Sequence, residues 1–360
     1  MGGWTPALWF LASEQGAWYD SSDMSTLFQD FTGTTPVTAV EQPVGLMLDR
    51  RLGLVEQADS VLHPLTGYPS GTWSYSADTV LRNGSSFGQI AVDTGAALDA
   101  TKKYWLQFTV AGFSGDSFTM HVGGSNIGAI SANGSYRFLI SGAGSVGLKI
   151  IPWGGTVGQA TISAISIREL PGNHASQATS ASRPVLRLDG ANYYFALDRV
   201  DDHLTVLTGG GGTTGICISA AIRAGGAGNA RTIWSDRGTN TGYRLSINAS
   251  NQLVLSAGNG SAHTEVVGPT VTAGTDYVVT GWHDGTNLNV QLNAGAATSA
   301  AFGTATAGTA GFTIGKDNGA ATGYYGERIY EIVYRKNDTS SAGDRTSLIA
   351  YMAKQAGITL

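Results

Sequence analysis

Apolar and polar residues alternate with a period of two along most of the chain, from about residue 72 to residue 334. In residues 103–110, for example, Tyr104, Leu106, Phe108 and Val110 would share one side of an extended chain. The same alternation recurs in residues 117–122, 136–140, 146–150, 216–222, 243–247, 288–292 and 330–334. This pattern is typical of half-buried strands in antiparallel sheets.

Turn dipeptides separate these stretches and set the spacing of the strands. They are Asn83-Gly84, Asn133-Gly134, Asn259-Gly260 and Asp284-Gly285, and each favours a tight connection between strands. Many short strands at this spacing are typical of β-sandwiches. We therefore predict an all-β fold.

One strand departs from simple alternation. In residues 160–167, Ile162 lies on one side of the extended chain, whereas Ile165 and Ile167 lie on the other. A β-bulge between them would account for the change of side.

A single helix is predicted, at the C-terminus. Ser341 and Asp344 have the spacing of a capping box, and Gly357 is placed to end the helix. The apolar face of this helix would be formed by Leu348, Ile349, Tyr351 and Met352. We expect this face to pack on a sandwich.

The composition indicates a folded chain rather than a disordered one. Hydrophobic residues make up 42% of the 360 residues, and charged residues make up 13%, about half the usual ~25%. At ~150 residues per domain, the length predicts about two domains. Cys217 is the only cysteine and cannot form an internal disulfide, and its neighbours Ile216 and Ile218 indicate a buried, structural thiol.

Charge and hydropathy argue against several functions. The formal charge is −5, and Lys and Arg form no run longer than two, so we expect no nucleic-acid partner. No apolar stretch approaches the ~18–20 residues that span a bilayer, so we expect no membrane insertion. The first basic residue is Arg50, so we expect no secretory signal peptide.

Several separated segments carry a further pattern. Residues 46–53 read LMLDRRLG, and residues 194–204 read YFALDRVDDHL. Four other segments belong with them, at residues 17–23, 172–186, 327–334 and 344–357. Together they resemble the bacterial and phage members of the laminin-G-like, concanavalin A-like lectin and glucanase sandwiches.

This resemblance implies a discontinuous parent sandwich formed by residues 17–53 plus 171–360. A second module, residues 54–170, would be inserted into it, and this insert resembles the carbohydrate-binding jelly rolls of phage structural proteins. Residues 1–16 would form an N-terminal docking arm. The predicted fold is thus all-β, with two β-sandwich (jelly-roll) modules, the second inserted into the first, and a short C-terminal helix.

The resemblance also implies a candidate calcium site. Asp198, Asp201 and Asp202 form an acidic cluster, and Arg199 stands where the parent motif has glycine. Laminin-G and pentraxin relatives often bind calcium through such oxygens, although a hard cation takes six to eight ligands. We expect no cofactor to be required, with calcium as the one candidate.

The carboxylates do not match those of a glycosidase. The closest pair of glutamates is Glu327 and Glu331, which on one strand would lie about 13 Å apart at ~3.3 Å per residue. Both glycosidase geometries need ~5–9.5 Å, so we interpret the two as exposed strand charges. The sequence contains no nucleophile or zinc-binding motif in a suitable context, and its two G-x-G-x-x-G strings are not followed by the helix that a nucleotide site requires. We expect no enzymatic activity, and a glycoside hydrolase with an unrecognised carboxylate pair is the less favoured alternative.

Aromatic side chains supply the candidates for ligand binding, because a sugar offers an apolar face to a ring and hydroxyl groups to amides and carboxylates. The glycan-binding candidates are Trp73, Tyr75, Trp153, Trp234 and Trp282. Trp105 lies on the side of its strand opposite to Tyr104 and Phe108, so it belongs either to a second buried face or to an exposed one.

Three apolar residues near the N-terminus have no obvious place in a sandwich. Trp4, Trp9 and Phe10 precede the first family-like strand. We expect them to dock onto a partner or a neighbouring subunit.

These observations predict a non-enzymatic bacteriophage virion protein, of the tail, fibre or capsid-decoration type, that presents lectin-like sandwiches to host-surface glycans as a receptor-binding element. It would be made in the host cytoplasm without a signal peptide and assembled with other virion proteins. Self-association, with a trimer as a plausible homo-oligomer, would add avidity to weak single sites. The alternative is a purely structural capsid-decoration or tail and baseplate protein without a ligand.

Overall fold

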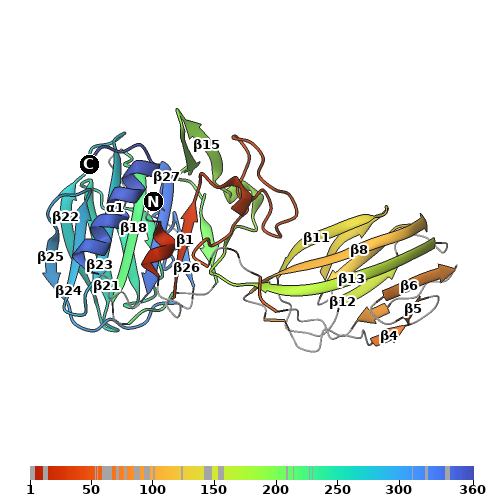
Figure 1. The fold of residues 1–360 in the computed structure, drawn as a ribbon. Helices are drawn as coiled ribbons and strands as arrows, with labels where there is room; N and C mark the ends of the chain where they lie inside the picture. The colour runs from red at the N-terminus through yellow and green to blue at the C-terminus, as the bar shows by residue number, and fades with distance from the viewer. Residues whose placement is uncertain are drawn as a thin grey trace. The chain divides into compact units, whose positions relative to one another are not determined.

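The computed structural model of the chain divides into two compact units. Unit 1 comprises Met1–Phe31, Thr35–Leu54 and Gly172–Leu360, and unit 2 comprises Thr32–Thr34 and Val55–Pro171. The structure describes residues 5–10, 15–52, 54, 56–58, 67–69, 73–76, 79–84, 90–92, 98–99, 102–122, 125–141, 148–152, 158–207, 210–213, 215–226, 228, 230–309, 311–320, 323–336 and 341–360. Each unit is built of antiparallel sheets (Figure 1).

Unit 1 contains two large sheets. Sheet A has the order β15-β16-β27-β18-β23-β24-β25, with β1 also paired to β27. Its strands are β1 (Gly16–Asp20), β15 (Val185–Asp189), β16 (Asn192–Ala196), β18 (Ile216–Arg223), β23 (Asp276–His283), β24 (Asn287–Leu292), β25 (Thr298–Ala301) and β27 (Arg328–Lys336).

Sheet B has the order β2-β3-β14-β17-β26-β19-β20-β21-β22. Its strands are β2 (Leu27–Phe28), β3 (Leu46–Met47), β14 (Ala175–Ser176), β17 (Leu204–Val206), β19 (Arg231–Ser235), β20 (Tyr243–Ile247), β21 (Gln252–Gly258), β22 (His263–Thr270) and β26 (Phe312–Ile314). The described residues also include three short 3-10 helices. The helix η1 (Pro6–Trp9) precedes β1, whereas η2 (Met24–Thr26) and η3 (Ser180–Ser182) lie in connections between strands.

The main core of unit 1 lies between sheets A and B. Alternate residues of the strands point into it, as the period of two predicts: Ile216, Ile218, Ala220 and Ile222 from β18, and Tyr243, Leu245 and Ile247 from β20. Burial of apolar area on this scale is the main stabilising term of a sandwich.

Two segments that are far apart in the sequence meet in unit 1. Strand β3 pairs with β14, so that Met47 faces Ala175. The adjacent Asp49 is fully buried, and its carboxylate accepts hydrogen bonds from the backbone N–H groups of Trp18 and Asn173, each at 2.9 Å. The backbone N–H of Asp49 in turn donates to Nδ1 of His174 at 3.0 Å. One buried carboxylate therefore joins three stretches of chain.

The predicted C-terminal helix is confirmed as α1 (Ala342–Gln355). The Ser341 side chain accepts a hydrogen bond from the backbone N–H of Asp344, and the Asp344 side chain accepts one from the backbone N–H of Ser341, which completes the capping box. Gly357 follows the helix with φ +67°. Leu348, Ile349 and Met352 of α1 pack on the outer face of sheet A in a second core. Among the described residues, no helix is long and apolar enough to cross a membrane.

Unit 2 contains two five-stranded sheets. Sheet C has the order β11-β8-β13-β6-β5, and sheet D the order β10-β9-β12-β7-β4. The strands of sheet C are β5 (Trp73–Ser76), β6 (Thr79–Gly84), β8 (Lys103–Gly115), β11 (Gly134–Ser141) and β13 (Gly158–Leu170). The strands of sheet D are β4 (Gly67–Pro69), β7 (Ile90–Val92), β9 (Phe118–Val122), β10 (Ser125–Ile130) and β12 (Leu148–Pro152).

The core of unit 2 contains Tyr104, Leu106, Phe108 and Val110 of β8, as the alternation predicts. The bulge predicted in residues 160–167 is confirmed, because the pairing of β13 with β8 shifts between Ser163 and Ser166. Both Ile162 and Ile165 therefore reach the same core.

The turn dipeptides have mixed outcomes. Gly260 and Gly285 adopt positive φ angles of 90° and 92°, as tight turns require. Asn133 lies in the bend before β11. Asn83-Gly84 is instead the end of strand β6, where Gly84 pairs with Gly158, so the predicted turn at this dipeptide is wrong. Its cross-strand partner on β13 keeps the segment extended.

Candidate functional site

Two predicted glycan-binding residues belong to cores of unit 1. Trp234 is fully buried, with its ring centroid 4.7 Å from that of Tyr334. The pairing of β19 with β20 shifts between Thr232 and Trp234, and this bulge lets Trp234 join the neighbouring Ile233 in the core. Trp282 is 7% exposed and belongs to the core under α1. Neither ring is available to a ligand, so these two assignments are corrected.

The other predicted glycan-binding residues cannot be placed. Trp73 and Tyr75 lie on strand β5, but their side chains lie outside the described part of the chain. Trp153 also lies outside the described residues.

The N-terminal apolar residues pack on their own chain. Trp9, at the end of η1, is 4% exposed and belongs to the core under α1. The guanidinium carbon of Arg335 lies 5.2 Å from its ring centroid. Phe10 is half-buried, with the Arg51 guanidinium 5.6 Å from its ring. Because α1 and sheet A already cover Trp9, its predicted role in docking a partner is corrected, and Trp4 lies outside the described residues.

The acidic cluster on unit 1 closes a loop. Asp198, Asp201 and Asp202 each place a carboxylate oxygen within 4.8 Å of the others. Asp198 Oδ1 accepts hydrogen bonds from the backbone N–H groups of Val200 at 2.8 Å and of Asp201 at 3.2 Å. Asp201 Oδ2 accepts one from Ser182 Oγ at 2.6 Å. The carboxylate of Asp202 accepts a hydrogen bond from the backbone N–H of Asp198 at 3.0 Å, so all three acids hold the loop by hydrogen bonds.

The three carboxylates by themselves are part of the ligand set that a calcium ion needs. A calcium ion takes six to eight oxygen ligands, whereas the cluster offers three carboxylates whose oxygens already accept hydrogen bonds. Burial, followed by the negative charge of Asp198, raises the pKa of Asp202 to about 6. Arg199 adopts φ +67°, so this loop takes the left-handed conformation without glycine.

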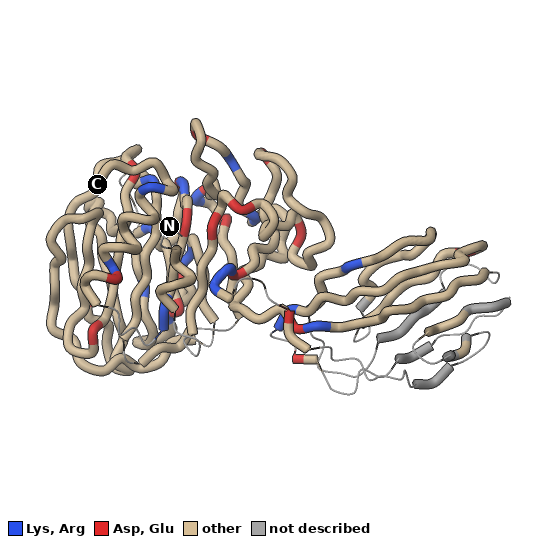
Figure 2. The backbone as a smooth tube through the Cα atoms, in the orientation of Figure 1, with Lys and Arg blue, Asp and Glu red and all other residues tan. Residues whose placement is uncertain are grey.

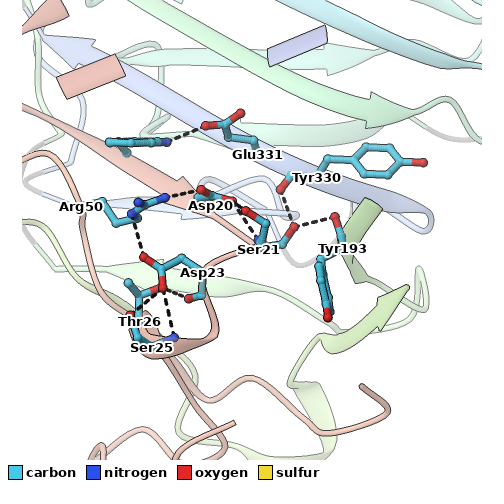
Figure 3. A network of polar contacts seen from close by, with 11 residues as sticks. Asp20, Ser21, Asp23, Ser25, Thr26, Arg50, Tyr193, Tyr330 and Glu331 are labelled. Carbon is cyan, nitrogen blue, oxygen red and sulfur yellow. Dashed lines mark hydrogen bonds and ion pairs between the residues drawn. The ribbon is translucent and has the colours of Figure 1, made fainter. Parts of the chain in front are cut away.

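A buried carboxyl group lies where strands β1 and β27 meet (Figure 3). Glu331 is 2% exposed, so our interpretation of it as an exposed strand charge was wrong. Its Oε1 accepts a hydrogen bond from Trp18 Nε1 at 2.6 Å, and its Oε2 is buried with no hydrogen-bond partner. Burial, followed by the negative charge of Asp20, raises the pKa of Glu331 well above its usual value. Glu331 is also inaccessible to a substrate.

Asp20, the cross-strand neighbour of Glu331, is held differently. Its carboxylate pairs with Arg50 and accepts hydrogen bonds from the backbone N–H and hydroxyl groups of Ser22, at 2.8 and 2.6 Å. Arg50 also binds Asp23 at 3.1 Å and lies over the Trp18 ring at 4.3 Å. Among the described residues, the network therefore pairs Asp20 with a cation but gives Glu331 none (Figure 3).

The outer face of sheet B carries a polar row. Thr313, Ser235, Arg244, Ser256 and Glu265 are cross-strand neighbours on five successive strands. Arg244 binds Glu265 at 3.3 Å and Asp317 at 3.0 Å. Within the row, the charged groups of Arg244 and Glu265 therefore bind each other.

The outer face of sheet C joins an aromatic ring to polar side chains. Trp105 on β8 is half-buried on the side opposite the core, which decides between its two alternatives. The guanidinium carbon of Arg137, on β11, lies 4.0 Å from its ring centroid, a cation–π contact. Arg137 also pairs with Glu56, and Gln107 Nε2 donates to both Glu56 oxygens at 3.3 Å. We name Glu56, Trp105, Gln107 and Arg137 the Trp105 cluster.

Hydroxyl groups continue this face across the sheet. Thr109, on β8, lies between Ser135 on β11 and Ser163 on β13, and its Oγ1 lies 3.4 Å from Ser135 Oγ. Ser166 on β13 is the cross-strand neighbour of Gln107. Cross-strand partners point to the same side of a sheet, so these groups surround the Trp105 cluster. The face offers one part-exposed ring and several hydrogen-bonding groups.

Comparisons with known proteins give weak similarities. No protein-family model and no curated protein matches the chain. The CBM40 of a Ruminococcus gnavus IT-sialidase, bound to α2,6-sialyllactose, is 15% identical over 39% of this chain and 84% of its own, with a TM-score of 0.31. Mouse laminin α1 domains LG4-5 are 10% identical over 76% of this chain and 94% of their own, with a TM-score of 0.35.

A third structure, the tandem CBM22 domain of Paenibacillus barcinonensis Xyn10C, is 9% identical over 83% of this chain and 100% of its own, with a TM-score of 0.25. At these identities and TM-scores the similarities assign neither a family nor a ligand to the chain.

Proposed function

We propose that the protein binds glycans without cleaving them, through the outer face of sheet C in unit 2. The observation that carries this proposal is the Trp105 cluster, in which a half-buried indole lies beside a guanidinium, an amide and a carboxylate. A sugar ring is amphipathic, so a site for it combines an aromatic surface with fixed hydrogen-bonding groups. The part of the indole that remains exposed would contact the apolar side of the sugar.

The polar members of the cluster would hold the sugar hydroxyls. Glu56 accepts, and Gln107 and Arg137 donate, so hydroxyl groups of either orientation find a partner. The Glu56 contacts to Arg137 and Gln107 also fix these side chains before a ligand arrives, which lowers the entropy cost of binding.

A glycan array with the full chain tests this proposal. We expect saturable binding by the wild type and a loss of about tenfold or more in affinity for Trp105→Ala, because a central aromatic anchor commonly contributes this much. Trp282→Phe, which changes a tryptophan of unit 1 buried under α1, is the matched control and should bind normally. Circular dichroism checks that both variants fold, and unchanged binding by Trp105→Ala would refute the proposed site.

The proposal also covers catalysis and cofactors. Mass spectrometry of a bound glycan after long incubation should show no cleavage products. Binding should persist in EDTA, since none of the four residues of the Trp105 cluster is a member of the acidic cluster. Cleaved product would support the glycosidase alternative.

The narrower role, as a receptor-binding component of a bacteriophage particle, is supported by the sequence resemblance. Mass spectrometry of purified particles and analytical ultracentrifugation of the isolated protein test incorporation and self-association. A folded protein that is incorporated into particles but binds no glycan would support the purely structural alternative.

A further inference from the structure

We infer that the glycan bound at the Trp105 cluster is acidic, and that Arg168 recognises its carboxylate or sulfate group. This inference rests on the proposed function and specifies its ligand.

Arg168 occupies a position where a ligand at Trp105 would meet it. It lies on β13 as the cross-strand neighbour of Trp105, so the two side chains leave the sheet on the same side. Arg168 is half-buried, and within the described part of the chain it has no hydrogen-bond or ion-pair partner. A guanidinium stays charged and offers five N–H donors. These donors are available beside the ring.

The charges on this face favour an anion. Among the described residues, strands β8, β11 and β13 contribute three cations to it, Lys103, Arg137 and Arg168, and Glu56 contributes a carboxylate. Glu56 already pairs with Arg137. The whole chain carries a formal charge of −5 and few charged residues, dispersed along the backbone (Figure 2). A local excess of positive charge in such a chain attracts an acidic ligand.

The geometry of a guanidinium narrows the chemistry. Arginine binds carboxylates and sulfates through two parallel hydrogen bonds, which are stronger than bonds between neutral groups. Nucleic acid needs a series of cations along its phosphates, whereas this face has a few cations beside one aromatic ring, and Arg137 already pairs with Glu56. An acidic sugar residue fits a ring and an adjacent guanidinium together.

The test uses two ligands that differ only in charge. A uronic acid-containing oligosaccharide and its carboxyl-reduced counterpart are titrated into the full chain by calorimetry, with a sulfated oligosaccharide in a second arm. We expect the wild type to bind the acidic form about 10- to 100-fold more tightly than the reduced form, as charge-assisted hydrogen bonds allow. Arg168→Gln should lose this preference and still bind the reduced form, and Arg168→Lys should keep part of it. Arg187→Gln, an exposed arginine of unit 1, is the control.

The outcomes separate this inference from the proposed function. Equal affinity for both oligosaccharides, unchanged in Arg168→Gln, would overturn the inference while leaving glycan binding intact. Binding that does not change in Trp105→Ala would overturn the proposed site itself. A DNA oligonucleotide that binds as tightly as the acidic oligosaccharide, with the same loss in Arg168→Gln, would show general polyanion binding and overturn the inference.

Discussion

Glu331 makes the stability of unit 1 depend on pH in a way that one substitution can remove. The carboxyl group is buried and lies beside the carboxylate of Asp20, and it forms no ion pair with any residue that the structure describes. Glu331→Gln keeps the size of the side chain and can keep the hydrogen bond from Trp18 Nε1 to Oε1. It cannot ionise. The variant therefore isolates the free energy of burying this charge.

The expected size follows from proton binding. Burial and the charge of Asp20 raise the pKa of Glu331 in the folded protein well above the ordinary 4.5. Between the two values the folded protein holds one proton more than the unfolded chain, so the free energy of unfolding falls as the pH rises, by about 1.4 kcal/mol per pH unit. The stabilisation from this proton is complete below the pKa that Glu331 has in the unfolded chain, and it is lost as the pH rises towards the pKa that Glu331 has in the folded protein. Glu331→Gln removes that dependence.

Urea unfolding from about pH 5 to about pH 8 measures this slope. Tryptophan fluorescence reports mainly on unit 1, which contains five of the eight tryptophans. The stability of Glu331→Gln relative to the wild type should increase with pH at about 1.4 kcal/mol per unit across the titration range. Glu327→Gln makes the same chemical change at a half-buried position and controls for the loss of one charge. A difference between Glu331→Gln and wild type that is constant with pH would refute the reasoning.

Three other predictions test the fold of unit 1. Gly258→Ala should lower the free energy of unfolding by about 1–3 kcal/mol, because a Cβ there would lie 2.3 Å from the backbone of Asn240. Gly303→Ala is the control, since a Cβ at Gly303 meets nothing within 4 Å. Equal melting temperatures for the two variants would contradict the close approach at Gly258. The pKa of Asp202 is raised to about 6, so its protonation stabilises the folded state at acid pH, and this contribution is lost as the pH rises through about 6. In thermal melts over that range, the stability of Asp202→Asn relative to the wild type should therefore increase with pH. A difference in stability that does not change with pH would count against this prediction. Cys217 is fully buried, so Ellman's reagent should modify it only on unfolding, and rapid modification of the native protein would show that β18 is exposed.

The strands were predictable where one face of a sheet is buried. The positions of Tyr104, Leu106 and Phe108 follow the period of two, and the structure places all three in the core of unit 2. The bulge in β13 was also predictable, because Ile162 and Ile165 could not otherwise face one core. Local sequence is sufficient in these cases, since the side-chain period of a strand does not depend on its partners.

Local sequence was insufficient where a distant element covers a strand. Glu331 looks like an exposed charge on β27, but β1 pairs beside it, and the hydrogen bond from Trp18 to Glu331 spans 313 residues. Trp234 was misassigned because a bulge in β19 places its side chain in the core. Its adjacent apolar neighbour Ile233 was a usable signal of the bulge in β19, since two consecutive core residues break the alternation.

The Trp105 cluster was partly visible in the sequence. The side of β8 opposite the core reads Trp105, Gln107 and Thr109, and a tryptophan followed by polar residues with that period indicates a face in contact with solvent. The partners Glu56 and Arg137 come from elsewhere in the chain. Only the pairing of β11 and β13 with β8 brings Arg137 and Arg168 beside the ring.

We place the proposed ligand on unit 2 because the sheets differ in whether one or both of their faces are covered. In sheet A, one face forms the main core and the other lies under α1 and η1, which takes up Trp9, Trp18 and Trp282 as structural residues. Trp234 fills the main core. One face of sheet C forms the core of its unit, and the other face carries Trp105 with Arg168 beside it, an arginine that has no ion-pair partner among the described residues. Among the tryptophans whose side chains the structure describes, Trp105 is the one that lies outside the three hydrophobic cores, which is why we place the proposed site there.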